Sequence, residues 1–367
     1  MKIMFVIHSL HCGGAERATT GLANYWAAAG EEVSILTNSG RETDFYSVDH
    51  CVKRITLMDD LQNVPPSSGI VANIKRIFAL RKIIKKVEPD ICIGMMTHSA
   101  VLVAISRIGL PGKYFGSERV HPPRYPLGAI WEFLRSHTYK ALNGIVVLSK
   151  PTAEWLAKNT NAKNIEVIPN AVQWPLPLST PIVEPCRKLK SERKVILSVG
   201  RFVHQKGFDL LLDAFGGIAD EFPDWNLCIL GNGPLLEQFQ KQKHQLRIKS
   251  QIFYPGRVGN LTDWYTRADI FVLPSRFEGF PNALVEAMSH GLPVISADCL
   301  TGPADLIHND INGILVPPED VEALQAALFR TMSENRLRDR LGDNAKRVRM
   351  DLSIQKVSKK WMSLFKA

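Results

Sequence analysis

The sequence predicts an α/β protein made of two doubly wound domains, each built on a parallel sheet. Three observations carry this prediction. Short apolar runs alternate with longer helical segments, a proline-rich stretch interrupts the pattern once, and the pattern then restarts. Strands that alternate with helices form parallel sheets. A chain of 367 residues is also long enough for two domains of ordinary size.

The first block, residues 1–173, is predicted to be the N-terminal domain. Its first strand, 2–8, leads into a helix that runs to Ala29 and ends at Gly30. Later strands are expected at 33–37, 90–94, 113–116, 144–148 and 164–168.

The second block, residues 194–349, is predicted to be the C-terminal domain. A linker is expected at 174–193, because four prolines fall between 175 and 185. Strands are expected at 194–200, 225–230, 252–254, 270–273 and 294–296. Ligands of such sheets bind at the carboxyl ends of the strands, so the two domains are expected to face a central cleft that holds the site.

The composition is ordinary for a globular protein, with 45% hydrophobic and 22% charged residues. The six cysteines form no C-x-x-C pair, which favours a reduced chain over a disulfide framework or a metal site. The N-terminal apolar run is too short for a secretory signal, and no membrane span is expected. The net charge of +9 permits an anionic partner.

Residues 276–286 combine two acids with a predicted helix start. Glu278 and Glu286 stand eight positions apart around Pro281, and the apolar run 268–275 before them is expected to be a buried strand. Proline suits the first helical turn, so Pro281 is expected there. A helix N-terminus attracts phosphate, and carboxylates accept hydrogen bonds from hydroxyl groups. A nucleotide sugar fits this pattern, and exposed helix charges are the alternative.

Two loops at predicted strand ends are candidates for phosphate binding. Gly13 and Gly14 follow the first strand and open a helix, so backbone N–H groups there could approach a phosphate closely. Arg201 and Lys206 follow the first strand of the second block and could neutralise a diphosphate. A plain turn and a solvated loop are the respective alternatives.

A third loop, after the predicted strand 113–116, contains Glu118 and Arg119 and ends in two prolines. Charged side chains fixed at a strand end are candidates for acceptor or catalytic contacts. An ion pair that only holds the loop is the alternative.

Residues 73–87 form a predicted amphipathic helix with six cations and no acid. Apolar residues such as Phe78 lie among the cations, which suits a membrane-surface helix, and an ordinary amphipathic helix with a solvated basic face is the alternative. No interleaved aromatics or nucleic-acid module supports a nucleic-acid partner. The residues expected to contact membrane or acceptor are Lys75, Arg81, Lys82 and Lys85.

Taken together, these motifs resemble glycosyltransferase family 4, whose members are retaining enzymes with the GT-B fold. The matching segments are the E-x7-E motif from Glu278 to Glu286, the diphosphate loop at Gly200-Arg201 and Lys206-Gly207, the first glycine loop at Gly13-Gly14, and the domain-ending segment Ile168-Pro169-Asn170. The resemblance covers nearly the whole chain and implies that a C-terminal helix, about 350–367, crosses back onto the N-terminal domain.

The resemblance also implies roles for single residues. Gly14, Arg201 and Lys206 would hold the donor diphosphate, with Gly13 in the same glycine loop. The remaining implied contacts are Glu286 with the ribose, Val258 with the base edge, Glu278 with the transferred sugar, and Phe280, Pro281 and Asn282 around the sugar pocket. Many members place a histidine in the loop occupied here by 117–121, so Glu118 and Arg119, with His121 as a further candidate, are expected near the reacting carbon. No D-x-D pair occurs, and neither a metal nor a cofactor is expected.

The implied activity is the transfer of a hexose or N-acetylhexosamine from a nucleotide sugar, most simply a UDP sugar, to a polyprenyl-diphosphate-linked saccharide. The motifs Gly13–Arg17 and Ser117–Arg119 are similar to those of the branch that assembles O-antigen, capsule or N-glycan. Such a protein would be cytoplasmic and peripheral to the inner face of the cytoplasmic membrane. A GT-B epimerase, a transferase for a soluble acceptor and a non-catalytic nucleotide-sugar-binding protein are the alternatives.

Overall fold

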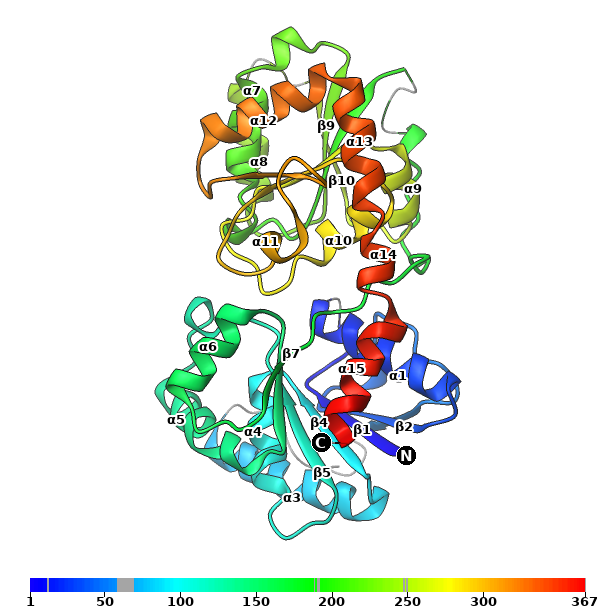
Figure 1. The fold of residues 1–367 in the computed structure, drawn as a ribbon, viewed down its shortest axis with the longest axis vertical. Helices are drawn as coiled ribbons and strands as arrows, with labels where there is room; N and C mark the ends of the chain where they lie inside the picture. Colours follow the sequence, from blue (N-terminus) through cyan, green and yellow to red (C-terminus); the bar gives the residue numbers. More distant parts are fainter. Residues whose placement is uncertain are drawn as a thin grey trace. The chain divides into compact units, whose positions relative to one another are not determined.

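The computed structural model describes residues 1–11, 13–57, 69–187, 189, 192–246, 248 and 250–366. The chain divides into two compact units (Figure 1). The first domain comprises Met1–Ala171 and Ile354–Ala367, and the second comprises Val172–Ser353. Each contains a sheet whose strand pairs are all parallel, so the predicted class of two doubly wound α/β domains is confirmed.

The first domain has a seven-stranded sheet in the order β3-β2-β1-β4-β5-β6-β7. Its strands are β1 (Lys2–Ile7), β2 (Glu32–Thr37), β3 (Lys53–Thr56), β4 (Ile91–Met95), β5 (Lys113–Ser117), β6 (Gly144–Val147) and β7 (Ile165–Val167). Its longer helices are α1 (Gly14–Ala28), α3 (Ile70–Val87), α4 (Thr97–Ser106), α5 (Ala129–Thr138), α6 (Lys150–Asn159) and α15 (Ile354–Lys366). The strand order reverses between β1 and β4, which is where such sheets open a crevice for ligands.

The second domain has a six-stranded sheet in the order β10-β9-β8-β11-β12-β13. Its strands are β8 (Lys194–Val199), β9 (Trp225–Leu230), β10 (Ile252–Gly256), β11 (Ile270–Leu273), β12 (Val294–Ala297) and β13 (Ile314–Val316). Its helices are α7 (Phe208–Gly216), α8 (Leu236–Gln245), α9 (Leu261–Arg267), α10 (Asn282–Ser289), α11 (Pro303–Leu306), α12 (Val321–Ser333), α13 (Asn335–Ala345) and α14 (Val348–Asp351). Here the strand order reverses between β8 and β11.

All the strands expected from the sequence are present, but β3 and β13 were missed. Both lie at the edge of a sheet, where a strand has only one neighbour to pair with. β3 has four residues and begins with two cations, Lys53 and Arg54, so it carries no apolar run. β13 has only three residues. Pairing with the neighbouring strand, rather than local pattern, makes these segments strands.

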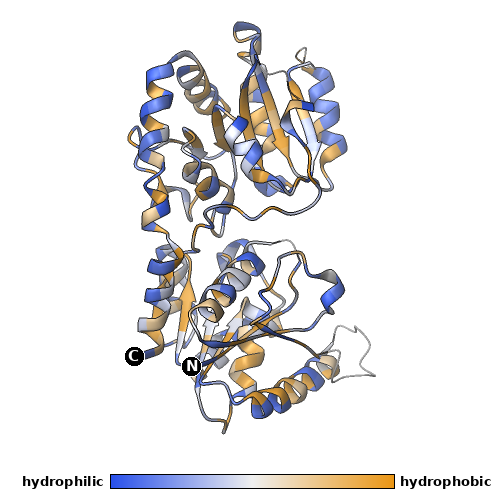
Figure 2. Cartoon of the chain, turned by 90° about the vertical axis from the view of Figure 1, so that its right-hand side faces the viewer, coloured by the Kyte–Doolittle hydropathy of each residue, from blue (hydrophilic) through white to orange (hydrophobic). Residues whose placement is uncertain are grey.

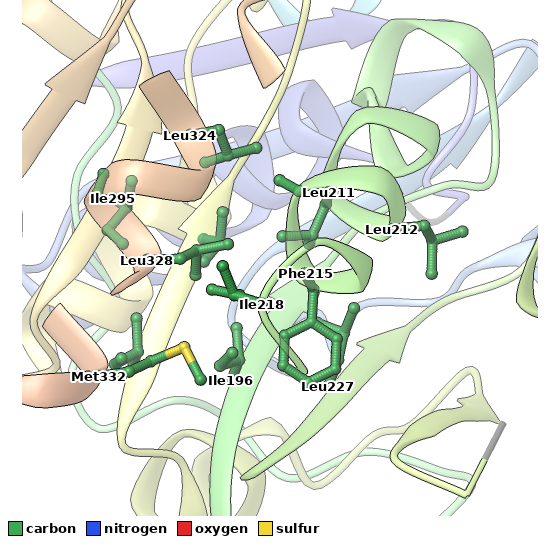
Figure 3. Close-up of a cluster of buried hydrophobic side chains, with 14 of the residues drawn as sticks. Ile196, Leu211, Leu212, Phe215, Ile218, Leu227, Ile295, Leu324, Leu328 and Met332 are labelled. Carbon is green, nitrogen blue, oxygen red and sulfur yellow. The ribbon is translucent and has the colours of Figure 1, made fainter. Parts of the chain in front are cut away.

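The strands of both sheets are largely hydrophobic, as expected for parallel sheets covered by helices on both faces (Figure 2). In the second domain, Phe215 of α7 and Leu328 of α12 meet Ile196 and Leu227 of the sheet in one buried cluster (Figure 3). This packing fixes the loops that leave the carboxyl ends of β8 and β11.

The proline-rich segment predicted as a linker packs against the second domain along its described residues. Leu176 and Leu189 are buried in a core cluster of that domain. The carbonyl of Val183 accepts a hydrogen bond of 2.9 Å from the indole of Trp264. These contacts hold the segment against the second domain, although proline-rich segments commonly form exposed linkers.

The C-terminal helix α15 belongs to the first domain, where it lies beside α1 (Figure 1). Trp361 is fully buried and meets Trp26 edge to face, with 6.4 Å between the ring centroids. The indole N–H of Trp26 donates to Ser358 Oγ at 2.7 Å. Phe365 adds a second edge contact to Trp26 at 5.7 Å. These aromatic contacts hold the end of the chain onto the first domain.

We predict that Trp361→Ala destabilises the first domain by about 3–5 kcal/mol, because it empties a fully buried site. Urea unfolding followed by circular dichroism measures this change. Lys359→Ala, at an exposed position of the same helix, is the control and should change stability by no more than about 0.5 kcal/mol. Equal effects of the two variants would contradict the proposed anchoring.

Candidate functional site

The second domain brings the predicted phosphate-binding and acidic loops together at the point where its strand order reverses. Arg201 and Lys206 follow β8, whereas Glu278 follows β11, and these two strands are direct neighbours. The carboxyl ends of parallel strands lie at one edge of the sheet. Cationic and acidic side chains that are 72 positions apart in the sequence therefore meet.

Two glycines place the Lys206 side chain. A Cβ atom at Gly200 would stand 3.2 Å from Cδ and Cε of Lys206, so the lysine stem lies close against that backbone. Gly207 has φ +63°, and a Cβ atom there would stand 2.0 Å from the carbonyl oxygen of Pro274. Only glycine fits this left-handed position beside the loop that follows β11.

Arg276 ties the two loops together. Its guanidinium donates to both carboxylate oxygens of Asp209 at 2.9 and 2.6 Å, to Glu319 at 2.7 Å and to the carbonyl of His204 at 2.9 Å. Burial opposes ionisation of Asp209, but the hydrogen bonds and charge of Arg276 outweigh it and hold its pKa below the usual value. The amide of Gln205 adds a 2.9 Å bond to the carbonyl of Phe277.

Lys206 and Glu278 form a largely buried ion pair. Lys206 Nζ lies 2.6 Å from Glu278 Oε1, and the two side chains are 16% and 5% exposed. Ser275 Oγ donates to the same oxygen at 2.7 Å, and Thr301 Oγ1 donates to the Glu278 carbonyl. Within the described part of the chain, Oε2 of Glu278 accepts no hydrogen bond. This oxygen and the other two N–H groups of Lys206 are available to a ligand.

Glu286 lies on the buried side of α10 and is held by the neighbouring helix α9. Tyr265 OH donates to Glu286 Oε2 at 3.0 Å, and both residues are buried. Helix α10 begins at Asn282, one residue later than predicted. Pro281 precedes it, and the Pro281 carbonyl accepts the first helical hydrogen bonds, from Leu284 and Val285, at 3.0 and 3.2 Å.

Arg201 is exposed and makes no side-chain hydrogen bond or ion pair within the described ranges. Val258 is buried just after β10, and Phe280 and Asn282 are half-buried around the start of α10. An exposed cation, a paired lysine and two held carboxylates suit a ligand that carries both phosphate and hydroxyl groups.

In the first domain, Gly13 and Gly14 lie where predicted, after β1 and at the start of α1. Gly13 is extended and its carbonyl accepts a hydrogen bond from the Arg17 N–H at 3.1 Å. A Cβ atom at Gly13 would stand 2.3 Å from the Glu16 carboxylate. The first turn of α1 has N–H groups without a partner inside the helix, but the Glu16 carboxylate already lies at this turn and accepts a hydrogen bond from its own N–H.

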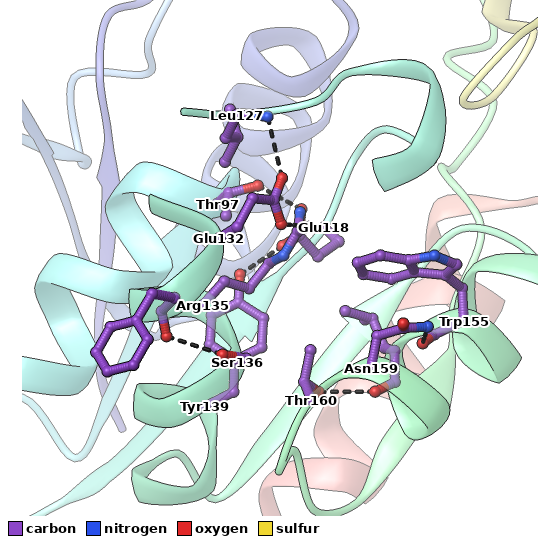
Figure 4. A network of polar contacts seen from close by, with 12 residues as sticks. Thr97, Glu118, Leu127, Glu132, Arg135, Ser136, Tyr139, Trp155, Asn159 and Thr160 are labelled. Atoms are coloured by element: carbon purple, nitrogen blue, oxygen red, sulfur yellow. Dashed lines mark hydrogen bonds and ion pairs between the residues drawn. The ribbon is translucent and has the colours of Figure 1, made fainter. Parts of the chain in front are cut away.

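The carboxylate of Glu118 lies inside the first domain (Figure 4). Its Oε2 accepts a 2.7 Å hydrogen bond from Thr97, and its Oε1 accepts one from Tyr139 OH. Burial raises its pKa above the usual value. The side chain is 1% exposed, and each of its two carboxylate oxygens accepts one of these hydrogen bonds.

Arg119 and His121 are also buried. Arg119 donates to Asn170 Oδ1 at 2.7 Å and stands 5.8 Å from the ring centroid of Trp361. Burial lowers its pKa to about 9. His121 Nδ1 lies 3.1 Å from Thr152 Oγ1. The prediction that one of the residues 117–121 lies at the reacting carbon stays a prediction.

Helix α3 confirms the predicted amphipathic helix and refines the predicted basic face. Lys75, Lys82 and Lys85 are exposed, and Phe78 among them is 70% exposed. Arg81 is different, because its guanidinium donates to the carbonyls of 106 and 108 at 2.8 and 2.5 Å and so caps the end of α4. No helix in the described ranges is both long enough and apolar enough to cross a bilayer.

Sequence reasoning missed the residues that support the site. Arg276 adjoins the acidic motif, but nothing in the sequence pairs it with Asp209, 67 positions away. Ser275 and Tyr265 resemble ordinary strand-end and helix residues. Of these three residues, only Ser275 could have been found from the sequence, because it stands three positions before Glu278.

Comparison with known proteins gives two family matches. The model for glycosyl transferases group 1 matches residues 185–348, and the model for glycosyltransferase family 4 matches residues 12–173. The chain is 28% identical over 365 residues to the GalNAc-alpha-(1->4)-GalNAc-alpha-(1->3)-diNAcBac-PP-undecaprenol alpha-1,4-N-acetyl-D-galactosaminyltransferase of Campylobacter jejuni, which covers 99% of this chain and 98% of that protein. It is 33% identical over 189 residues to a lipopolysaccharide 1,6-galactosyltransferase of Salmonella typhimurium, which covers 48% of this chain and 49% of that protein.

Solved structures share the fold. Sucrose-phosphate synthase from Thermosynechococcus elongatus superposes with a TM-score of 0.83 at 19% identity and covers 100% of this chain and 98% of that one. The lipopolysaccharide outer core galactosyltransferase WaaB in its apo form superposes with a TM-score of 0.74 at 22% identity and covers 99% of each chain.

His290, just after α10, gives a pH-dependent prediction. Its Nδ1 lies 2.8 Å from the Glu286 carbonyl, its ring stacks on Tyr265 at 5.0 Å, and burial, aided by Arg349, lowers its pKa from 6.5 to about 4. Because the folded pKa is depressed, the folded state resists protonation. Stability is therefore full above pH 6.5 and decreases as the pH falls towards 4.

We predict that His290→Phe, which keeps the ring but cannot titrate, shows a smaller loss of unfolding temperature between pH 7 and pH 5 than the parent protein. His308→Asn, at an exposed position of the same domain, should leave the loss unchanged. Scanning calorimetry at both pH values makes the comparison. An identical pH dependence in all three proteins would contradict the prediction.

Proposed function

The chain belongs to glycosyltransferase family 4, with the GT-B fold, and we propose that it is a retaining enzyme for lipid-linked glycan assembly. The proposed reaction moves a hexose or N-acetylhexosamine from a UDP sugar to a polyprenyl-diphosphate-linked saccharide. The observation that carries this proposal is the Lys206–Glu278 pair at the reversal point of the second sheet. One partner suits phosphate and the other suits sugar hydroxyls.

In the proposed complex, Arg201 and Lys206 neutralise the donor diphosphate, and Gly14 of the first domain adds a backbone N–H. The free Oε2 of Glu278 accepts hydrogen bonds from the transferred sugar, and Glu286 accepts them from the ribose. The base edge would meet Val258. The loop of Phe280, Pro281 and Asn282 would shape the sugar pocket.

The proposed chemistry needs no metal, because two cations stabilise the charge that develops on the leaving diphosphate. The bond between the anomeric carbon and the phosphate oxygen breaks, and both electrons leave with the nucleotide. The acceptor hydroxyl attacks on the same face, and its proton passes to the departing phosphate oxygen. The configuration of the sugar is therefore retained.

The relatives support the choice of donor and acceptor class. The Campylobacter jejuni protein is named as an N-acetylgalactosaminyltransferase acting on an undecaprenol-diphosphate-linked saccharide, and the alignment with it spans nearly the whole chain. The relative in Erwinia amylovora is an amylovoran biosynthesis glycosyltransferase, 25% identical over 98% of each chain. The first name states an N-acetylhexosamine and a lipid-linked saccharide, which are the sugar and acceptor classes proposed for this chain.

A lipid-linked acceptor requires contact with a membrane surface, and α3 is the proposed contact. Its exposed face mixes Lys75, Lys82 and Lys85 with Ile74 and Phe78, which are 47% and 70% exposed. Each cation near an anionic surface contributes about 1 kcal/mol, and the apolar side chains can enter the headgroup region. The protein would then act at the inner face of the cytoplasmic membrane as a peripheral protein.

For the first domain, we propose that Glu118 and Arg119 hold the acceptor loop in place from inside. Thr97 and Tyr139 fix Glu118, and Asn170 fixes Arg119. The backbone and the neighbouring residues of the loop would then contact the acceptor near the reacting carbon.

The test is transfer from a panel of nucleotide sugars to a polyprenyl-diphosphate-linked saccharide, with the anomeric configuration of the product read by NMR. We expect transfer with retention. Glu278→Gln should reduce the rate about a hundredfold or more, since it weakens contacts to the sugar, whereas exposed Glu322→Gln should not. Inversion, or epimerisation of the nucleotide sugar without transfer, would overturn the proposal.

The membrane contact has its own prediction. Replacing Lys75, Lys82 and Lys85 by Glu should weaken binding to phosphatidylglycerol vesicles by about a hundredfold or more, from about 1 kcal/mol per lost cation. The matched control replaces three exposed lysines of the first domain by Glu, namely Lys53, Lys359 and Lys360. Vesicle flotation measures both variants. Equal losses would indicate a response to net charge alone and would refute a specific role for α3.

A further inference from the structure

We propose that the first domain carries a second anion-binding site, suited to a phosphate group, at the edge of its sheet where β5, β6 and β7 begin. A pocket of about 390 Å³ opens there, within the size range of ligand pockets in proteins. Its lining comes from residues 107–109 before β5, residues 140–143 before β6, and residues 163 and 164 before β7.

This pocket is separate from the proposed transfer site. The strands β5, β6 and β7 are parallel neighbours, so their amino ends share one edge of the sheet and their carboxyl ends share the other. The loop 117–121, proposed to face the acceptor, follows the carboxyl end of β5. The pocket lies before β5, at the opposite edge. Its ligand would therefore not be the transferred sugar.

The charges lining the pocket have one sign. Arg107, Lys140 and Lys163 line it, and none of the lining residues is acidic. Arg107 is oriented by a hydrogen bond to the Ala141 carbonyl and by the ring of Tyr114, 5.2 Å from its guanidinium carbon. Lys140 and Lys163 are exposed and form no hydrogen bond or ion pair with any described residue. A bound anion would relieve the repulsion among these three cations.

The partial negative charges of helix C-termini are too small to balance these three cations. Arg107 is the C-cap of α4, and α6 ends at Asn159, four residues before the lining residue Lys163. Each such end carries about −0.5 of an elementary charge. Two ends offset about one of the three positive charges, so the pocket keeps a net positive charge.

Polar and apolar groups at the pocket fit a phosphate attached to a larger molecule. The Asn143 side chain is fixed, because its Oδ1 accepts a 2.9 Å hydrogen bond from the Tyr114 N–H, and this leaves its Nδ2 as a donor. Ile108 lines the same pocket and is 68% exposed. A phospholipid headgroup and a soluble phosphate compound share this chemistry.

The experiment counts bound pyrophosphate by isothermal titration of the parent protein of 367 residues, the double variant Lys140→Glu with Lys163→Glu, and a control with Lys53→Glu and Lys359→Glu. The control has the same charge change at exposed positions outside the pocket. We expect the parent and the control to bind one pyrophosphate more than the pocket variant, or to bind it about tenfold or more tightly at that site. All three proteins keep the transfer site, so pyrophosphate bound there does not change the difference between them.

Flotation with phosphatidylglycerol and phosphatidylcholine vesicles then separates the two sources. Weaker phosphatidylglycerol binding in the pocket variant than in the control, beyond the binding that α3 contributes to both, would identify a lipid headgroup. Unchanged flotation together with the lost pyrophosphate would identify a soluble phosphate compound. Equal pyrophosphate binding by all three proteins would overturn the proposal, whatever the outcome of the transfer assay.

Discussion

The ion pair between Lys206 and Glu278 places a cation, which suits phosphate, beside a carboxylate, which suits hydroxyl groups. Two opposite charges at such low exposure are stable only when each has the other and further hydrogen bonds, since an unpaired buried charge costs several kcal/mol. Ser275 supplies one of those bonds, and Gly200 gives the lysine stem room. Further hydrogen bonds join the loops after β8 and β11, from which the two partners come.

The pair depends in turn on the topology of the second sheet. β8 and β11 are neighbours only because the strand order reverses between them. Arg276 then joins the two loops through Asp209 and the His204 carbonyl. These hydrogen bonds form without a ligand, and loops that are already ordered lose less binding energy when a ligand binds. The first domain repeats the architecture with Gly13 and Gly14 at its own reversal point.

The sequence allowed prediction of the features that local pattern encodes. Strands with apolar runs were predictable, and so were Glu278, Glu286 and Lys206, which stand at fixed offsets from strand ends. Edge strand β3 was not, because pairing rather than composition defines it. Glu118 looked like a loop charge, yet Thr97 and Tyr139, each 21 positions away, enclose it. Arg81 looked like a surface cation, yet it caps a neighbouring helix. Contacts between distant segments decide such cases, and sequence pattern does not report them.

The central claim gives Lys206 the diphosphate and Glu278 the sugar, and calorimetric binding of UDP and of the preferred UDP sugar to Glu278→Gln tests it most directly. The account predicts that UDP affinity is not reduced, because the glutamine side-chain oxygen can still accept the hydrogen bonds of Lys206 and Ser275, and Lys206 and Arg201 remain as cations for the diphosphate. The extra affinity contributed by the sugar should fall by about tenfold or more, because a charged acceptor of its hydroxyl hydrogen bonds is lost. Equal losses for both ligands, or no loss for either, would contradict this division of roles.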